Sequence, residues 1–302
     1  MLMPHPQTIE IFLPFGDPQS LRVASVVTRT VSLVEIPRSQ LRLFLQRPEA
    51  GRVGLYFLFG EEDKTEQPKV YVGQTGKLGE RLKQHNMGKD FWNRAVVAVT
   101  SKDVLTEVHA RFLEVLSLRQ AEAVGRYVLD NRQKGRDSPH MSSSMRAVCD
   151  ELFETISILL TTLGYPVFKP VLEQFPLGEG QVAQVQDDVP ELFFCRGNGA
   201  EGQGRYTEEG MVVLAGSYVP VSSSKLEKKA PRVAAARQEA LKNGFLRLEG
   251  NRLVLSRDML FKTSSKAATF LLGRYATGWK RWKDGEGRAL SKWRRGVTEN
   301  DV

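Results

Sequence analysis

The chain has 302 residues, of which 41% are hydrophobic and 26% are charged. This composition is typical of a soluble globular protein, and the length predicts two domains of ordinary size. The net charge of +8 favours polyanionic partners such as nucleic acids. The longest apolar stretch, residues 152–168, is interrupted by Glu, Thr, Gly and Pro, so we expect no membrane span.

The cysteines and histidines are too scattered to predict a zinc site. Cys149 and Cys195 are far apart and match no metal-ligand spacing, and the four histidines at positions 5, 85, 109 and 140 do not cluster. We therefore expect reduced thiols. The first residues have no basic start and no apolar stretch of signal-peptide length, which predicts a cytoplasmic protein.

The first fifty residues predict a small β-rich leader. The stretches 8–16 and 21–36 are rich in β-branched residues, and Gly16, Asp17 and Pro18 separate them as a turn. A short helix should follow and end before Pro48.

Two aromatic strands, a helix, a third strand and a long helix are expected next. The runs 53–60 and 69–75 predict neighbouring strands joined by a polar loop, and 77–88 predicts a helix that ends at Gly88. Residues 92–101 predict a strand. Thr100 and Asp103 are an acceptable capping start for a helix over about 101–123, on which periodicity alone assigns Glu114 to solvent.

Breaks in composition predict the remaining boundaries. A polar stretch around 131–144 closes the first unit, a helix follows near 144–164, and an acidic segment with Gly and Pro leads into the second unit. We expect an α+β protein with a leader at 1–50, a central domain at 51–135, a helix and linker at 136–190 and a basic C-terminal domain at 191–302.

The residues of the central domain resemble the GIY-YIG nuclease family over positions 51–131. The first triplet is Gly54-Leu55-Tyr56 and the second is Tyr71-Val72-Gly73. The side chains that match the family's site, in the family's order, are Tyr56, Tyr71, Arg81, His85, Glu114 and Asn131. The resemblance implies a small three-stranded antiparallel sheet flanked by helices. One departure is that Gln74 and Thr75 follow the second triplet, where many relatives carry a basic residue.

The same resemblance implies a metal-dependent endonuclease that hydrolyses phosphodiester bonds in DNA. Glu114 would hold Mg²⁺ or Mn²⁺ together with water molecules. Tyr56 would act as general base and Tyr71 would position water. Arg81 would contact the phosphate, and His85 would tune a tyrosine or move a proton.

The C-terminal domain is similar to a domain of unknown function, DUF4357-like, that often accompanies GIY-YIG modules. Between Lys262 and Arg295 ten Lys or Arg stand against two acidic residues, a net charge of +8. Tryptophans are interleaved with these cations and could stack on bases. The candidate nucleic-acid contacts are Lys280, Arg281, Lys283, Lys292, Arg294 and Arg295.

A structural interpretation competes with each assignment. A tyrosine in a strand usually packs against its neighbours, and an Arg or Glu on a helix is usually exposed to solvent. A tryptophan in a terminal domain usually belongs to the hydrophobic core. The alternative function is a non-enzymatic module that binds nucleic acid or a protein and keeps the fold as a scaffold. The choice between DNA and RNA, the preferred substrate, the oligomeric state and any protein partners stay open.

Overall fold

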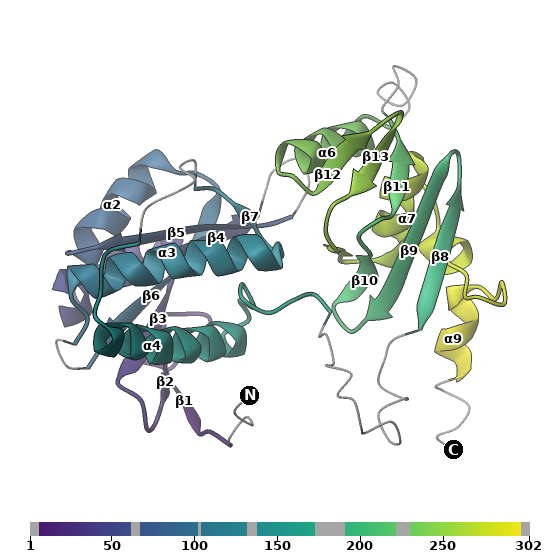
Figure 1. The fold of residues 1–302 in the computed structure, drawn as a ribbon. Coiled ribbons are helices and arrows are strands. Elements are labelled where there is room, and N and C mark those ends of the chain that lie inside the picture. Colours follow the sequence, from purple (N-terminus) through teal and green to yellow (C-terminus); the bar gives the residue numbers. More distant parts are fainter. Residues whose placement is uncertain are drawn as a thin grey trace, which may run out of the picture. The chain divides into compact units, whose positions relative to one another are not determined.

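The chain folds into two units, Met1–Lys169 and Pro170–Val302, which are described separately here (Figure 1). The computed structural model describes residues 6–61, 67–101, 104–131, 138–172, 191–221 and 230–296. Both units combine helices with a mostly antiparallel seven-stranded sheet, so the protein is α+β as expected. The boundaries expected at 50, 135 and 190 stay predictions, and most of the expected linker, residues 173–190, lies outside the described residues.

The sheet of the first unit is larger than the three strands expected for the central domain. Its strand order is β1-β2-β3-β6-β4-β5-β7, and all neighbours are antiparallel except β5 and β7. The strands are β1 (Ile9–Phe12), β2 (Arg22–Val26), β3 (Val31–Pro37), β4 (Gly54–Glu61), β5 (Pro68–Thr75), β6 (Trp92–Thr100) and β7 (Val128–Leu129). The three expected strands are neighbours in this sheet, in the order β6-β4-β5, followed by β7 at the edge. The sheet is larger than expected because β3 pairs with β6 along its whole length, which makes the leader part of the same sheet.

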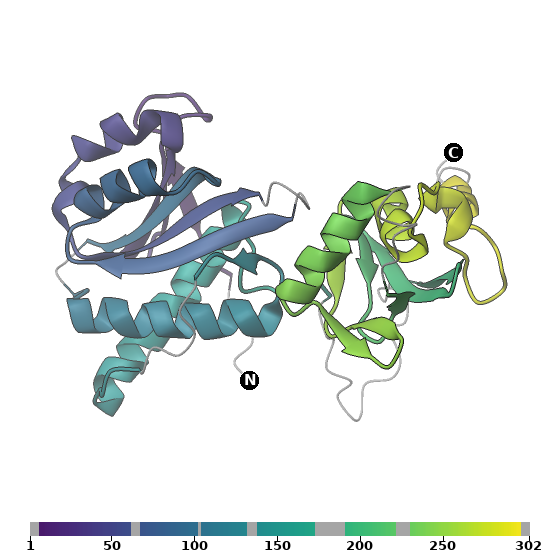
Figure 2. The same cartoon turned by 90° about the horizontal axis from the view of Figure 1, so that it is seen from above.

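Helices cover both faces of this sheet, as the edge-on view in Figure 2 shows. On one face α1 (Leu41–Leu45) and α2 (Leu78–Gly88) pack against alternate residues of β4, including Tyr56 and Leu58. On the other face α3 (Glu107–Val124) and α4 (Ser143–Thr162) pack against Leu55 and Phe57. The period-two alternation of a strand therefore divides the core into two layers.

Helix α3 begins later than the sequence suggested. Thr106 is its N-cap and forms a capping box with His109, which satisfies backbone donors that a start near residue 101 would leave open. The prediction that Glu114 faces solvent is also wrong, because its side chain is only 1% exposed.

A buried carboxylate ties the far end of the first unit to its sheet. Glu35 on β3 is 1% exposed, pairs with Arg22 on β2 and lies 3.6 Å from Arg94 on β6. The hydroxyl of Tyr165, beyond α4, donates a 2.7 Å hydrogen bond to it. These partners satisfy a charge that would be costly to bury alone.

The second unit has its own sheet, in the order β12-β13-β11-β9-β10-β14, with β8 paired to β9. The strands are β8 (Leu192–Gly197), β9 (Ala200–Thr207), β10 (Gly210–Val213), β11 (Tyr218–Pro220), β12 (Leu246–Glu249), β13 (Arg252–Leu255) and β14 (Met259–Phe261). The helices are α6 (Pro231–Lys242), α7 (Ser264–Leu272), α8 (Gly278–Arg281) and α9 (Leu290–Gly296). Arg237 of α6 is buried and donates to the carbonyls of Phe270 and Leu271 at the end of α7, where the helix dipole favours a cation.

The search for membrane-spanning helices in the described part of the chain found none of sufficient length and apolarity.

Candidate functional site

The two triplets place a phenol directly over a glycine. Tyr56 of β4 is paired with Gly73 of β5. A Cβ atom added at Gly73 would lie 2.3 Å from the Tyr56 hydroxyl oxygen, a distance that real Cβ atoms do not adopt. Gly73 is therefore needed so that the Tyr56 ring can lie flat across the neighbouring strand and reach α2.

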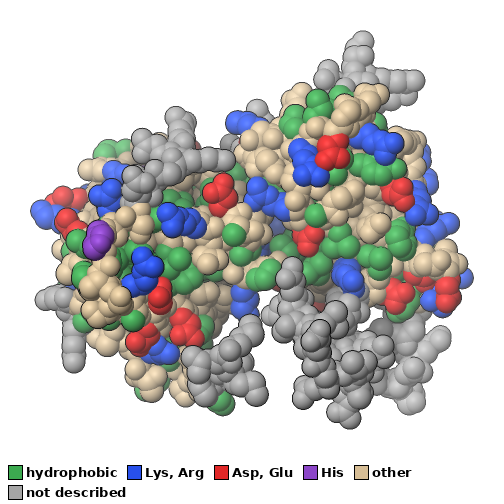
Figure 3. Space-filling view, viewed as in Figure 1, with side chains coloured by type: hydrophobic (Ala, Val, Ile, Leu, Met, Phe, Trp, Pro, Cys, Tyr) green, Lys and Arg blue, Asp and Glu red, His purple; other side chains and the backbone are tan. Residues whose placement is uncertain are grey.

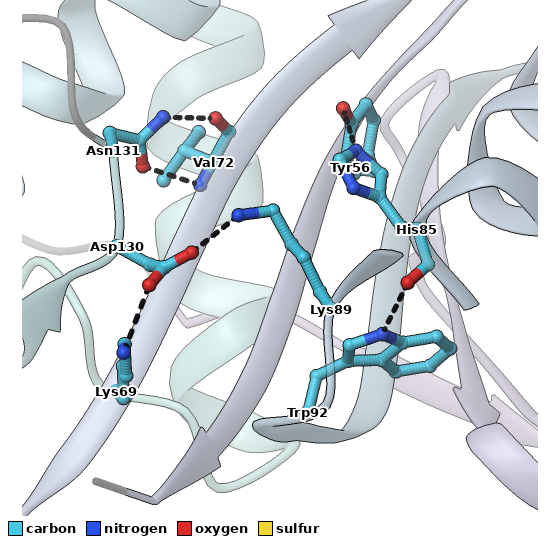
Figure 4. A network of polar contacts seen from close by, with 8 residues as sticks. All are labelled: Tyr56, Lys69, Val72, His85, Lys89, Trp92, Asp130 and Asn131. Carbon is cyan, nitrogen blue, oxygen red and sulfur yellow. Dashed lines mark hydrogen bonds and ion pairs between the residues drawn. The ribbon is translucent and has the colours of Figure 1, made fainter. Parts of the chain in front are cut away.

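Helix α2 brings a guanidinium and an imidazole to this phenol. Arg81 and His85 are four residues apart and share one face of the helix. Arg81 Nε donates a hydrogen bond of 3.1 Å to the Tyr56 hydroxyl oxygen, and His85 Nε2 lies 2.8 Å from the same oxygen. Tyr71 completes the group, with its ring centre 6.1 Å from that of Tyr56 and 5.0 Å from that of His85. Figure 4 shows the Tyr56–His85 contact between β4 and α2.

The chemistry of the groups fixes the direction of one of these hydrogen bonds. An arginine can only donate, so the Tyr56 oxygen accepts from Arg81, whereas the direction of the contact with His85 Nε2 depends on the histidine tautomer. Burial and the positive charges of Arg81 and Lys89 lower the pKa of His85 to about 4. His85 is therefore neutral at pH 7.

Burial dominates the acidity of Tyr56. Its side chain is 0% exposed, and this burial, together with the charge of Tyr71, raises its pKa above the ordinary range, although the hydrogen bond from Arg81 acts in the opposite direction. The same hydrogen bond raises the pKa of Arg81, so its guanidinium stays charged. Tyr71 is only half-buried and is the phenol that solvent can reach.

Glu114 is on α3, which packs against the face of the sheet opposite to Tyr56 and α2. Helix α3 begins beside Gly76, where an added Cβ would lie 2.5 Å from Glu107 Oε1. It then runs back along β5, and the chain after it pairs with Lys69 at the start of that strand (Figure 1). From Glu107 to Glu114 the helix rises about 10 Å, and from Gly76 to Gly73 the strand spans about 10 Å. Glu114 is thus level with Gly73.

Asn131 holds the outer edge of β5. Its side-chain amide donates to the Val72 carbonyl at 2.8 Å and accepts from the Val72 N–H at 3.0 Å (Figure 4). Strand β7 pairs with β5 only as far as Val70, so Asn131 continues the pairing with its side chain. Both polar groups of the Asn131 side chain form hydrogen bonds with the backbone next to Tyr71. Asn131 therefore helps to position this part of β5.

The sequence analysis missed three charged residues beside Tyr71. Lys89, the residue after α2, forms an ion pair with Asp130, and Lys69 Nζ lies 2.9 Å from the same carboxylate. Burial opposes the ionisation of Asp130, but the hydrogen bonds from the two lysines outweigh it and lower its pKa. A signal for Lys89 was present in its spacing, because it follows Arg81 and His85 at successive four-residue steps, although α2 ends at Gly88.

A metal ion would have Glu114 as its protein ligand. Among the residues that the structure describes, no group of three or more His, Cys, Asp or Glu side chains is arranged to hold a metal. One carboxylate still fits Mg²⁺ or Mn²⁺, since these ions keep several water ligands and use substrate phosphate oxygens. The Glu114 side chain is only 1% exposed in this structure, so a hydrated ion would require it to turn outward.

Comparison with known proteins identifies the second unit only. Residues 193–294, from β8 to α9, match the family described as Domain of unknown function (DUF4357). They form a DUF4357 domain. No curated protein and no solved structure matches the chain. The expected resemblance of the C-terminal part is confirmed, whereas no comparison supports the GIY-YIG resemblance of residues 51–131.

Four of the six candidate nucleic-acid contacts in the DUF4357 domain are on its surface. Lys280, Arg281, Lys283 and Lys292 are all exposed, while Arg294 and Arg295 belong to α9 but their side chains are outside the described part. Lys and Arg are spread over the face of this domain seen in Figure 3, with Asp and Glu among them. Positive charge on this face is therefore interrupted by acidic side chains and does not form one uniform basic surface.

The tryptophans of the DUF4357 domain differ in role. Trp282 is 0% exposed and donates to the Ser264 carbonyl at 3.0 Å, so the prediction that it is available to stack on a base is wrong. Trp293 is 37% exposed and donates to Asp284, whose carboxylate also accepts from Arg288. Of these two indoles, only Trp293 has surface available for stacking.

Proposed function

We propose that the protein is a metal-dependent endonuclease that hydrolyses DNA phosphodiester bonds at a GIY-YIG type site formed by residues 51–131. One observation carries the proposal. The chain of hydrogen bonds from Arg81 through Tyr56 to His85 lies beside the accessible phenol of Tyr71. Gly73 has no side chain and so leaves room for the Tyr56 ring. Packing alone does not require a buried phenol to be held between a fixed cation and a neutral imidazole.

The reaction needs a water oxygen to attack phosphorus while one P–O bond breaks, with a proton leaving the water and another reaching the leaving oxygen. Tyr71 is the phenol that can contact this water, since Tyr56 has no exposed surface. Tyr56 keeps its proton because its pKa is raised, and its contacts with Arg81 and His85 hold it beside Tyr71, which it orients. Arg81 contributes the fixed positive charge that the developing phosphorane requires.

Glu114 would hold Mg²⁺ or Mn²⁺, which supplies charge stabilisation at the phosphate when bound. Its helix, α3, packs against β5 from the face of the sheet opposite to Tyr56. The exposed lysines and arginines of the DUF4357 domain would add contacts to the DNA backbone that weaken with salt.

The test is cleavage of supercoiled plasmid with Mg²⁺ or Mn²⁺ by four proteins: the wild type, Glu114→Gln, Arg81→Met and Lys83→Met. Lys83 is exposed on α2, between the two site residues of that helix, and serves as the matched control. We expect nicking or cutting by the wild type and Lys83→Met, and losses of about 100-fold or more in the other two. A folded wild type that is inert with every metal, or equal cutting by all four proteins, overturns the proposal.

The alternative is a binding module that keeps this fold without turnover. The complete burial of Tyr56 and the use of both Asn131 amide groups by Val72 are compatible with a scaffold role. DNA binding that weakens steeply with salt, without cleavage under any metal, would favour this second function.

A further inference from the structure

A second cation lies against the phenol and imidazole cluster. Lys89 Nζ is 4.3 Å from the centre of the Tyr71 ring, and the Lys89 charge contributes to the lowered pKa of His85. It comes from the end of α2, one turn after His85, whereas Arg81 comes one turn before it. Two positively charged residues therefore precede and follow the imidazole along the chain, Arg81 within α2 and Lys89 just after it.

Asp130 fixes the position of Lys89. The carboxylate is about one-fifth exposed and pairs with Lys89 on one oxygen and with Lys69 on the other, as Figure 4 shows. Two ammonium groups against one carboxylate leave a net charge of +1. An ammonium has three N–H groups, and the ion pair with Asp130 engages one of the carboxylate oxygens, so Lys89 keeps donor capacity.

The other cation of the cluster uses part of its donor capacity within the protein. Arg81 Nε donates to Tyr56, and its NH1 group donates to Gln84 Oε1 at 2.9 Å. A phosphate that reaches Tyr71 from solvent carries at least one full negative charge, and a lysine held over the rim of that ring is suited to meet it as a point charge. The Lys89 side chain is 23% exposed, so solvent can reach part of it.

We propose that Lys89 is a second phosphate-binding residue of this site and that Asp130 is its positioning residue. This inference rests on the proposed nuclease function and deepens it. Lys89 donates to an oxygen of the scissile phosphodiester beside Tyr71, while Arg81 neutralises charge nearer Tyr56. The competing interpretation is that Asp130 with its two lysines is only a brace between β5, β7 and the end of α2.

Lys69 provides a matched control for this test. It pairs with the same carboxylate at 2.9 Å and lies over an aromatic ring, 4.9 Å from the centre of Phe91, whereas Lys89 is the lysine that lies over Tyr71. If Asp130 and its two lysines only stabilise the fold, replacing either lysine should lower the stability by a similar amount. If Lys89 contacts the phosphate, only replacing Lys89 should remove that contact.

We would measure kcat and KM for DNA cleavage with Mn²⁺, together with urea unfolding, for the full-length wild type, Lys89→Gln, Lys69→Gln and Lys89→Arg. We expect Lys89→Gln to lower kcat about 100-fold, Lys69→Gln to retain nearly the wild-type value, and Lys89→Arg to recover part of the loss. Both glutamine variants should unfold at similar urea concentrations.

Equal losses of activity and stability in the two glutamine variants would overturn the role of Lys89 and leave the nuclease proposal standing. Full activity of Lys89→Gln would do the same. A wild type that cleaves no DNA with any metal would overturn the nuclease proposal and, with it, this inference. The two failures are thus told apart by whether the wild type cuts.

Discussion

At the scale of residues, one oxygen atom organises the candidate site. The Tyr56 hydroxyl oxygen accepts from Arg81, lies within hydrogen-bonding distance of His85 and contacts the bare backbone of Gly73. The triplets and the Arg81–His85 spacing predicted these four residues as neighbours. They did not predict that Tyr56 would be fully buried, because burial depends on α1 and α2 covering that face, which a strand pattern does not encode.

The low pKa of His85 makes a prediction about stability. His85 titrates at about 4 when folded and near its ordinary 6.5 when unfolded, so between these values the unfolded chain binds more protons. The free energy of unfolding should therefore fall as the pH is lowered from about 6.5 to about 4, with a slope from this group of up to about 1.4 kcal/mol per pH unit. Urea unfolding at several pH values measures it.

Carboxylates also titrate between about pH 4 and 6.5 and contribute to the pH dependence of the free energy of unfolding. The contribution of His85 is therefore isolated by comparing variants with the wild type. His85→Gln should have a shallower pH dependence than the wild type, and His140→Gln, at an exposed position, should match the wild type. The same slope in all three proteins would contradict the assigned ionisation of His85.

At the scale of elements, α2 is held at its C-terminal end by a residue of the leader. Arg38 donates to the side chain and carbonyl of Asn86 and to the carbonyls of Asp90 and Trp92, and it stacks on the Trp92 ring. The Trp92 indole in turn donates to the His85 carbonyl. These contacts fix the turn of α2 that carries the imidazole.

We expect Arg38→Ala to lower the free energy of unfolding by about 2 kcal/mol, because several charge-assisted hydrogen bonds are lost together. Arg42→Ala, at an exposed position of α1, should change it little. Urea unfolding of both variants makes the comparison, and equal stabilities would show that Arg38 does not brace the helix.

The elements themselves were predicted where the pattern was local. Residues 77–88 and 92–101 carried clear helix and strand signals and form α2 and β6. The stretch 21–36, which the sequence marks only as rich in β-branched residues, forms β2 and β3, and the turn between Val26 and Val31 contains no Gly or Pro to announce it. Helix α3 was started too early because Thr100 resembles a cap, whereas Thr106 with His109 makes the actual one.

At the scale of the whole molecule, the pairing of β3 with β6 is the feature that the sequence did not reveal. It joins residues 31–37 to residues 94–100, and no local pattern specifies which strand lies next to which. The core around Tyr56 also includes Leu21, Val34, Ile36 and Phe44 of the leader. The phenol cluster is therefore supported by residues outside the segment that carries its motifs.

This support predicts how fragments behave. A fragment of residues 1–169 should unfold cooperatively, because it keeps the complete first sheet and both core layers. A fragment of residues 51–135 should be unfolded or aggregated, since β6 loses its partner and exposes an unpaired edge. Circular dichroism and urea titration distinguish the two, and a cooperative transition of the shorter fragment would contradict the integration of the leader.

The hydrogen bond between Tyr165 and Glu35 joins residues 130 positions apart. During synthesis the chain has supplied every side chain of the phenol cluster by the time Lys89 is added. The carboxylate of Glu35, however, waits for a hydroxyl that is translated 130 residues after it. Closing so long a loop is slow. Glu35 has Arg22 and Arg94 as earlier partners, and its last one becomes available only when residue 165 has been translated, so this half of the protein cannot complete the network around Glu35 before then.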